Sequence, residues 1–159
     1  MVKTIFRLDD RLIHGQVIEG WVHNLELTRI VVASDRVKED KEFSKILKFS
    51  SPSEINVEIL SLQELADKIR EGYLAEEDTI VLFESPEDVL ILLDYGVRIE
   101  YLNVGCMHRN KDKKLICSNI IASREDIEVF KDIDSMGVTM DSRPLPQSEK
   151  VNLMKIIDK

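Results

Sequence analysis

Short runs of β-branched and other apolar residues alternate along the chain with segments whose apolar residues recur at helical spacing. The runs TRIVVA at 28–33 and TIVLF at 79–83 are typical of buried strands. Between such runs, apolar side chains fall on one face of a helix, as Val17, Ile18 and Trp21 do. This alternation predicts an α/β fold: an open, mostly parallel sheet with helices on both faces.

The same pattern gives approximate bounds for each element. About seven strands are expected, at residues 4–8, 28–33, 56–60, 79–83, 98–104, 116–121 and 138–141. Helices are expected at 15–25, 41–49, 61–72, 85–96, 123–136 and 147–157. Several helix starts carry a capping signal, such as Ser61 three residues before Glu64, and Ser85 directly before Pro86. Because no linker, repeat or low-complexity tract separates these elements, we expect residues 1–159 to form a single domain.

Charge and composition narrow the class of ligand and the compartment. The chain carries 22 Lys and Arg against 30 Asp and Glu, a net charge of −8, and an acidic chain repels nucleic-acid backbones. The longest unbroken apolar run, at 89–93, is too short to span a membrane, and no signal peptide is visible. Cys106 and Cys117 are then expected to be reduced thiols. We therefore expect a cytoplasmic protein that binds no nucleic acid.

One loop concentrates the chemically active residues. In open parallel sheets, ligands bind at the carboxyl ends of the strands. That rule points to the loops at 9–14, 34–36, 84–86 and 105–114. The first of them lies in the run RLDDRLIHGQV at 7–17, which holds two arginines, two aspartates and a histidine. This loop is therefore the candidate site.

His14 is the candidate nucleophile of that loop. A neutral imidazole can attack phosphorus or carbon and form a covalent intermediate. A carboxylate that holds one ring nitrogen as N–H leaves the other nitrogen free to attack, and either Asp9 or Asp10 could do this. Arg11 is three residues before His14, and we predict that Asp10, Arg11 and His14 form the catalytic group.

The same loop can bind a phosphate. An arginine fork pairs with two phosphate oxygens at once, which suits Arg7 and Arg11. Gly15 and Gln16 open the following helix, whose free N–H groups and positive end attract anions. These four residues form the predicted phosphate-binding set. The competing interpretation is an ion-pair network that serves structure alone.

The run RLDDRLIHGQV, with Trp21 seven residues after His14, closely resembles the mannose/sorbose-family enzyme IIB of the bacterial phosphoenolpyruvate-dependent sugar phosphotransferase system (PTS). Further similar stretches are IVVASDRVKED, TIVLFESPEDVLILLDYGV and LNVGCMHRNKDKK, so the resemblance covers nearly the whole chain. One departure lies in the last stretch, where the family often has Gly-Gly after Asn-Val and this chain has Gly105-Cys106.

The resemblance implies a cytoplasmic phosphoryl carrier, peripherally associated with a membrane transporter and working without a cofactor or metal. His14 would accept a phosphoryl group on Nδ1 from an enzyme IIA, and Arg11 would help to hold it. The group would then pass to a sugar imported by the IIC and IID membrane components. The chain resembles a free-standing IIB with no fused IIA, and its sugar, whether mannose, fructose, sorbose or an amino sugar, is left open.

Two other functions compete with that of a sugar phosphotransferase. One is a regulatory module whose histidine is phosphorylated without passing the group to sugar; the other is an α/β anion-binding domain. In the basic loop at 108–114, Arg109 and Lys111 are candidates for docking a partner, against the alternative of a solvated turn. Cys106, His108 and Cys117 fit no usual zinc spacing, so we expect no metal.

Overall fold

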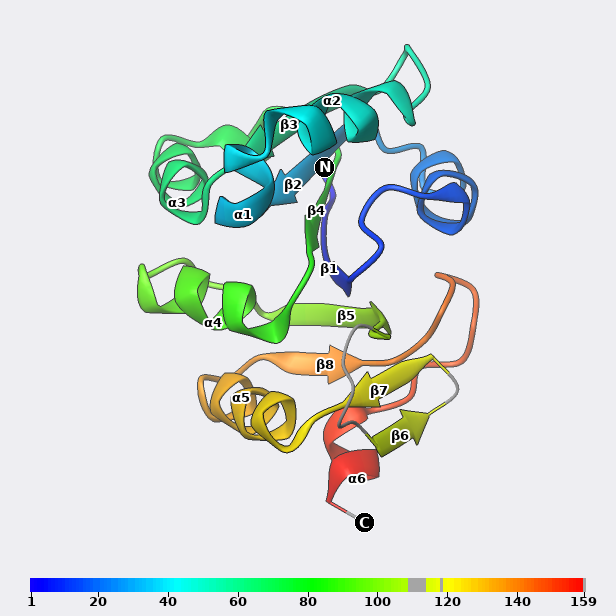
Figure 1. The fold of residues 1–159 in the computed structure, drawn as a ribbon, viewed down its shortest axis with the longest axis vertical. Helices are drawn as coiled ribbons and strands as arrows, with labels where there is room; N and C mark the ends of the chain where they lie inside the picture. The colour runs from blue at the N-terminus through cyan, green and yellow to red at the C-terminus, as the bar shows by residue number, and fades with distance from the viewer. Residues whose placement is uncertain (109–113, 118, 159) are drawn as a thin grey trace.

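Six parallel strands form the main sheet of the computed structural model, which describes residues 1–108, 114–117 and 119–158 (Figure 1). The strands are β1 (Thr4–Asp9), β2 (Arg29–Ala33), β3 (Asn56–Leu60), β4 (Thr79–Phe83), β5 (Tyr101–Cys106) and β8 (Thr139–Asp141). Their order is β3-β2-β4-β1-β5-β8, and every pair of neighbours is parallel. The predicted α/β fold with an open parallel sheet is confirmed.

The expected count of about seven strands was wrong. The segment at 116–121, expected as one strand of the sheet, instead contributes to an antiparallel hairpin of β6 (Lys114–Cys117) and β7 (Ile120–Ala122). Polar residues at 118–119 interrupt the apolar run, so its two halves pair with each other. The hairpin lies outside the main sheet and is joined to the end of β5 by a bridge between Met107 and Ile120.

Helices cover both faces of the sheet, as predicted. They are η1 (Gln16–His23), α1 (Asp35–Glu39), α2 (Lys41–Phe49), α3 (Leu62–Arg70), η2 (Tyr73–Ala75), α4 (Pro86–Asp94), α5 (Arg124–Ser135) and α6 (Leu153–Ile157). In Figure 1, α3, α4 and α5 lie together on one side, while the blue helix η1 lies on the other. No helix in the described part of the chain is long and apolar enough to cross a bilayer.

Two hydrophobic cores correspond to these two faces. Residues of α3, α4 and α5, including Leu65, Leu92 and Phe130, share one core. Residues of η1, α1 and α2, including Trp21 and Leu47, share the other. Alternate strand residues supply both cores, since the side chains of a strand point to opposite faces.

The C-terminal helix is shorter than expected. The sequence pattern suggested a helix over 147–157, but α6 covers only Leu153–Ile157. The chain between β8 and α6 instead runs alongside η1. There, Trp21 Nε1 donates a hydrogen bond to the carbonyl oxygen of Pro144 at 3.0 Å. This contact brings the loop after β8 beside the start of the candidate site.

Strands β1 and β5 position the candidate loop. In their register Arg7 pairs with Asn103 and Leu8 with Val104, but Asp9 pairs with Cys106, so β5 carries an extra residue at Gly105. A bulge of this kind re-aims the side chains beside it. Because β1 lies between β4 and β5, its carboxyl end is in the middle of the sheet edge where ligands bind.

Candidate functional site

His14 is held by its Nε2 atom. Asp9, the last residue of β1, is fully buried, and its Oδ2 lies 2.9 Å from His14 Nε2. Among the residues that the structure describes, none forms a hydrogen bond with His14 Nδ1. The side chain of His14 remains 18% exposed, so a partner can reach the ring. A carboxylate on Nε2 favours the tautomer with the proton there and leaves a lone pair on Nδ1.

Asp9 is the centre of the charged network around His14. Its Oδ2 accepts a hydrogen bond from Arg7 Nη2 at 3.1 Å, and its Oδ1 accepts one from the backbone N–H of Arg11 at 3.1 Å. Burial alone would raise the pKa of Asp9, but the hydrogen bond from His14 and the charge of Arg7 lower it to about 2. Asp9 is therefore ionised at neutral pH and accepts, rather than donates, in every one of these contacts.

The backbone after β1 turns back on itself to build this network. The N–H of Leu12 donates to the carbonyl oxygen of Asp9 at 2.9 Å. Leu12 has a φ of 60°, a left-handed conformation that is costly for a residue with a Cβ, yet its side chain is completely buried. Burial of this leucine stabilises the strained turn, and the turn brings Arg11 and His14 back to Asp9.

Arg7 lies inside the protein behind Asp9. Its side chain has no exposed surface, its Nη1 donates to Asn103 Oδ1, and its guanidinium is 4.9 Å from the centre of the Trp21 ring. Burial lowers the pKa of Arg7, while the charge of Asp9 opposes that effect. The guanidinium packs against the bulge, where a Cβ on Gly105 would overlap it. Arg7 thus holds Asp9 in position from the protein interior and has no contact with solvent.

Arg11 and Gln16 form the outer side of the site. The side chain of Arg11 is 45% exposed; its Nε is 3.3 Å from Asp9 Oδ1, and its Nη2 donates to Gln16 Oε1 at 3.1 Å. Burial would lower the pKa of Arg11, but the hydrogen bond to Asp9 raises it. Gly15, between His14 and Gln16, is exposed, and no heavy atom lies within 4 Å of the place where a Cβ would be.

Asp10 does not share this network with His14. Its carboxylate accepts a hydrogen bond from the backbone N–H of His108, and its own N–H donates to the carbonyl oxygen of Cys106 at 3.0 Å. Of the two aspartates that the sequence left open, Asp9 makes the contact to the imidazole. Asp10, the first residue of the turn after β1, faces the end of β5 through these two contacts.

The remaining sequence candidates lie elsewhere or outside the described residues. Arg109 and Lys111, the proposed docking residues, fall in the segment 109–113, which the structure does not describe. Cys106 is buried with its Sγ 2.6 Å from His108 Nδ1. Burial raises the pKa of Cys106 to about 11, and the negative charge of Asp9 adds to this. The thiol is therefore protonated at neutral pH, which disfavours a nucleophilic role.

The sequence pattern did not identify two residues that support the site, Asn103 and Arg143. Asn103 donates through Nδ2 to the carbonyl oxygen of Arg143 at 2.9 Å and so links β5 to the loop after β8. The Arg143 guanidinium lies 5.9 Å from the Trp21 ring, which Arg7 also approaches. The rule that places ligands at strand ends applies equally to the loop after β8, and it would have drawn attention to Arg143.

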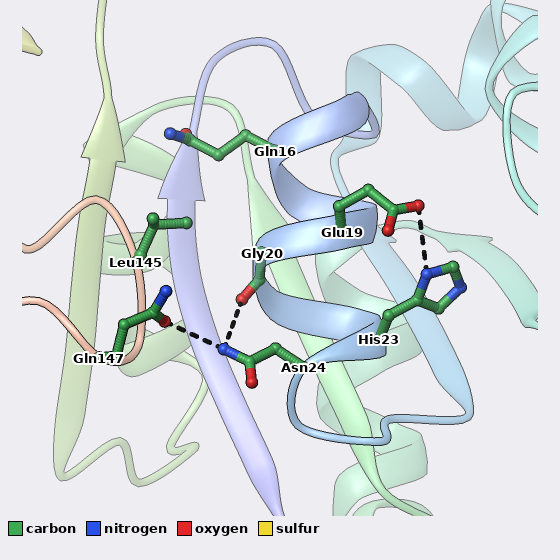
Figure 2. A pocket seen from close by; sticks show the side chains of 7 residues that line it. All are labelled: Gln16, Glu19, Gly20, His23, Asn24, Leu145 and Gln147. Atoms are coloured by element: carbon green, nitrogen blue, oxygen red, sulfur yellow. Dashed lines mark hydrogen bonds and ion pairs between the residues drawn. The ribbon is translucent and has the colours of Figure 1, made fainter.

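A groove of about 690 Å³ begins at Gln16 and follows η1 (Figure 2). Its other wall is the segment carrying Leu145 and Gln147, and Asn24 Nδ2 donates across it to Gln147 Oε1 at 3.0 Å. Farther along the helix, His23 Nδ1 pairs with Glu19 Oε1 at 3.2 Å, pointing away from Gln147. The candidate site therefore opens at one end into this groove.

Comparison with known proteins identifies the family to which these features belong. A family described as "PTS system sorbose subfamily IIB component" matches residues 3–159. The chain belongs to this family. The sorbose-specific EIIB component of Klebsiella pneumoniae is 32% identical over 158 residues, covering 99% of this chain and 96% of that protein. A crystal structure of the IIBSor domain from the same organism superimposes with a TM-score of 0.89, covering 99% of this chain and 97% of the other.

Other relatives of this IIB component carry different sugar names. The fructose-specific EIIB component of Bacillus subtilis is 28% identical, covering 97% of this chain and 94% of its own. The mannose-specific EIIAB component of Escherichia coli K12 is 31% identical, and this chain spans 49% of its length. Family membership makes the protein a transferase of the sugar phosphotransferase system. The resemblance read from the sequence is confirmed.

Proposed function

We propose that this IIB component carries a phosphoryl group on Nδ1 of His14, taking it from an enzyme IIA and giving it to a sugar. The single observation that carries this proposal is the 2.9 Å contact between His14 Nε2 and the buried, ionised Asp9. It fixes the ring by one nitrogen and leaves the other with its lone pair. A tautomer set in this way is what a nucleophilic imidazole needs.

The first transfer follows from this geometry. The Nδ1 lone pair of His14 attacks the phosphorus of phosphohistidine on IIA; the new N–P bond forms as the old one breaks, and the bonding pair returns to the donor imidazole. His14 acquires a positive charge, which Asp9 stabilises through the Nε2–H bond. Arg11 and the backbone N–H groups of Gly15 and Gln16 bind the phosphoryl oxygens, since phosphoryl transfer depends chiefly on position and charge.

The second transfer reverses the roles. A sugar hydroxyl attacks the phosphorus and loses its proton to solvent, while the N–P bond breaks and its electron pair returns to Nδ1. His14 is neutral again, with its proton still on Nε2 beside Asp9. Asp10 takes part only indirectly, by fixing the backbone between Asp9 and the end of β5.

The names of the relatives also support a set of partner proteins. The E. coli relative named as an EIIAB component supports IIA as the donor, because its printed name joins both components in one chain. We propose that IIC and IID membrane components present the sugar, and that the protein works at the cytoplasmic side of that transporter. The relatives are named for sorbose, mannose, fructose and N-acetylgalactosamine, so these names do not select one sugar.

Labelling from radioactive phosphoenolpyruvate tests this proposal. With the general phosphotransferase proteins and a matching IIA, we expect an acid-labile, base-stable phosphate on the wild-type protein and none on His14→Ala. His23→Ala is the matched control, since this exposed histidine lies at the far end of η1 and should leave labelling intact. Full labelling of His14→Ala would refute the assignment. Sugar phosphate formed with IIC and IID membranes separates the carrier from a purely regulatory module.

A further inference from the structure

Three metal-binding side chains meet beside the candidate site. Asp10, Cys106 and His108 each place one ligand atom within 4.8 Å of the other two. No other group of three such residues is this close in the part of the chain that the structure describes. The sequence spacing of cysteines and histidines did not reveal the group, because Asp10 follows β1 directly and the other two come from β5 and the residues after it.

Backbone hydrogen bonds hold the three residues together. The N–H of Asp10 donates to the carbonyl oxygen of Cys106 at 3.0 Å, and the N–H of His108 donates to the Asp10 carboxylate. Two of the three donors are buried and fixed, while the exposed His108 ring can adjust. The arrangement is therefore largely formed before any ion arrives.

The three donor atoms, a carboxylate oxygen, a thiol sulfur and an imidazole nitrogen, are of the types that a small thiophilic cation binds. Zinc binds thiolate, imidazole and carboxylate at about 2.0–2.3 Å in a tetrahedron, which places neighbouring donors about 3.5 Å apart. Cys106 Sγ and His108 Nδ1 are now 2.6 Å apart, so the His108 ring has to move outward by about 1 Å to meet this geometry. Magnesium and calcium prefer oxygen ligands only, and the thiol disfavours them.

We propose that Asp10, Cys106 and His108 form a binding site for Zn²⁺ or a similar thiophilic divalent cation, with a fourth position open to water. As the metal–sulfur bond forms, the thiol proton of Cys106 leaves to solvent. The three ligands of this site are not among the residues that contact His14. It lies one strand away from Asp9, which pairs with Cys106 in the sheet register.

Titration of the metal-free protein with Co²⁺ alone, and then competition by Zn²⁺ alone, tests the site. Bound cobalt reports its ligands, since a thiolate–cobalt bond gives a near-ultraviolet charge-transfer band and tetrahedral geometry gives strong visible bands. We expect one equivalent with both signals. Cys106→Ser should abolish the thiolate band, and His108→Gln should weaken binding at least about tenfold. Circular dichroism verifies that each variant is folded.

Two matched controls make the result decisive. Cys117→Ser removes the other cysteine and His23→Gln removes a histidine with two carboxylate neighbours, and both should bind cobalt like the wild type. Absence of the thiolate band in the wild-type protein overturns the proposal. So does a band that survives in Cys106→Ser, or one that disappears in Cys117→Ser. None of these readouts depends on phosphoryl transfer, so the metal site and the proposed function fail independently.

Discussion

Replacing Gly105 by alanine tests how Arg7 supports the site. A Cβ at this position would lie 2.5 Å from Arg7 Nη1 and closer still to two other guanidinium atoms, whereas ordinary contact begins at 3.4 Å. The difference, 3.4 minus 2.5, requires a shift of at least about 0.9 Å. Arg7 has no exposed surface, so the shift comes at the expense of its hydrogen bonds to Asp9 and Asn103.

The size of the effect follows from those bonds. A hydrogen bond to a charged group is worth about 1.5–3 kcal/mol, and a buried charge that loses its partner costs more. We therefore expect Gly105→Ala to lower the free energy of unfolding by about 3 kcal/mol, or the melting temperature by about 6–12 °C for a domain of this size. The rate of His14 phosphorylation should also fall, because Asp9 loses the hydrogen bond from Arg7 that holds it in position.

Urea denaturation, thermal melting and the rate of His14 labelling measure both effects. Gly15→Ala is the matched control for stability: a Cβ there meets nothing within 4 Å, and the residue's φ of −52° is helical. Its free energy of unfolding should stay within about 1 kcal/mol of wild type. If Gly105→Ala melts like the wild type and is labelled at the same rate, the structural role assigned to Arg7 is incorrect.

Two further predictions concern charge. Arg11→Lys keeps the positive charge, but a lysine cannot bond to both Asp9 and Gln16. The labelling of His14 should therefore slow by about tenfold, while the free energy of unfolding changes by less than about 1 kcal/mol. An unchanged labelling rate would argue against a phosphate-holding role for Arg11. Burial and the charge of Glu84 raise the pKa of Asp88 from 3.8 to about 7. Because the folded state then binds this proton more tightly than the unfolded state does, the free energy of unfolding should fall as pH rises from about 4 to 7. Asp88→Asn should remove that slope in melting temperature, whereas Asp94→Asn, an exposed acid on the same helix, should not.

Local sequence signals predicted most of the elements correctly. Ser61 and Ser123 cap α3 and α5 with the reciprocal bonds of a capping box, and Ser85 caps α4 ahead of Pro86. These signals work because each involves residues three positions apart. The short helix α1 was not predicted, since five residues give no helical periodicity to recognise.

Features that depend on distant strands could not be predicted in this way. The choice of Asp9 over Asp10 as the partner of His14 depends on which residue at the end of β1 faces inward. The bulge at Gly105 depends on the register between β1 and β5, strands about a hundred residues apart. The cluster of Asp10, Cys106 and His108 requires the same pairing, so sequence spacing alone could not have shown it.

Identifying which ring nitrogen of His14 carries the phosphate is the most direct test of the proposed mechanism. NMR of the phosphorylated, ¹⁵N-labelled protein measures the one-bond coupling between phosphorus and the ring nitrogen. We predict that the coupling falls on Nδ1, with Nε2 still protonated and bonded to Asp9. Coupling to Nε2, the nitrogen that Asp9 now holds, would contradict the account.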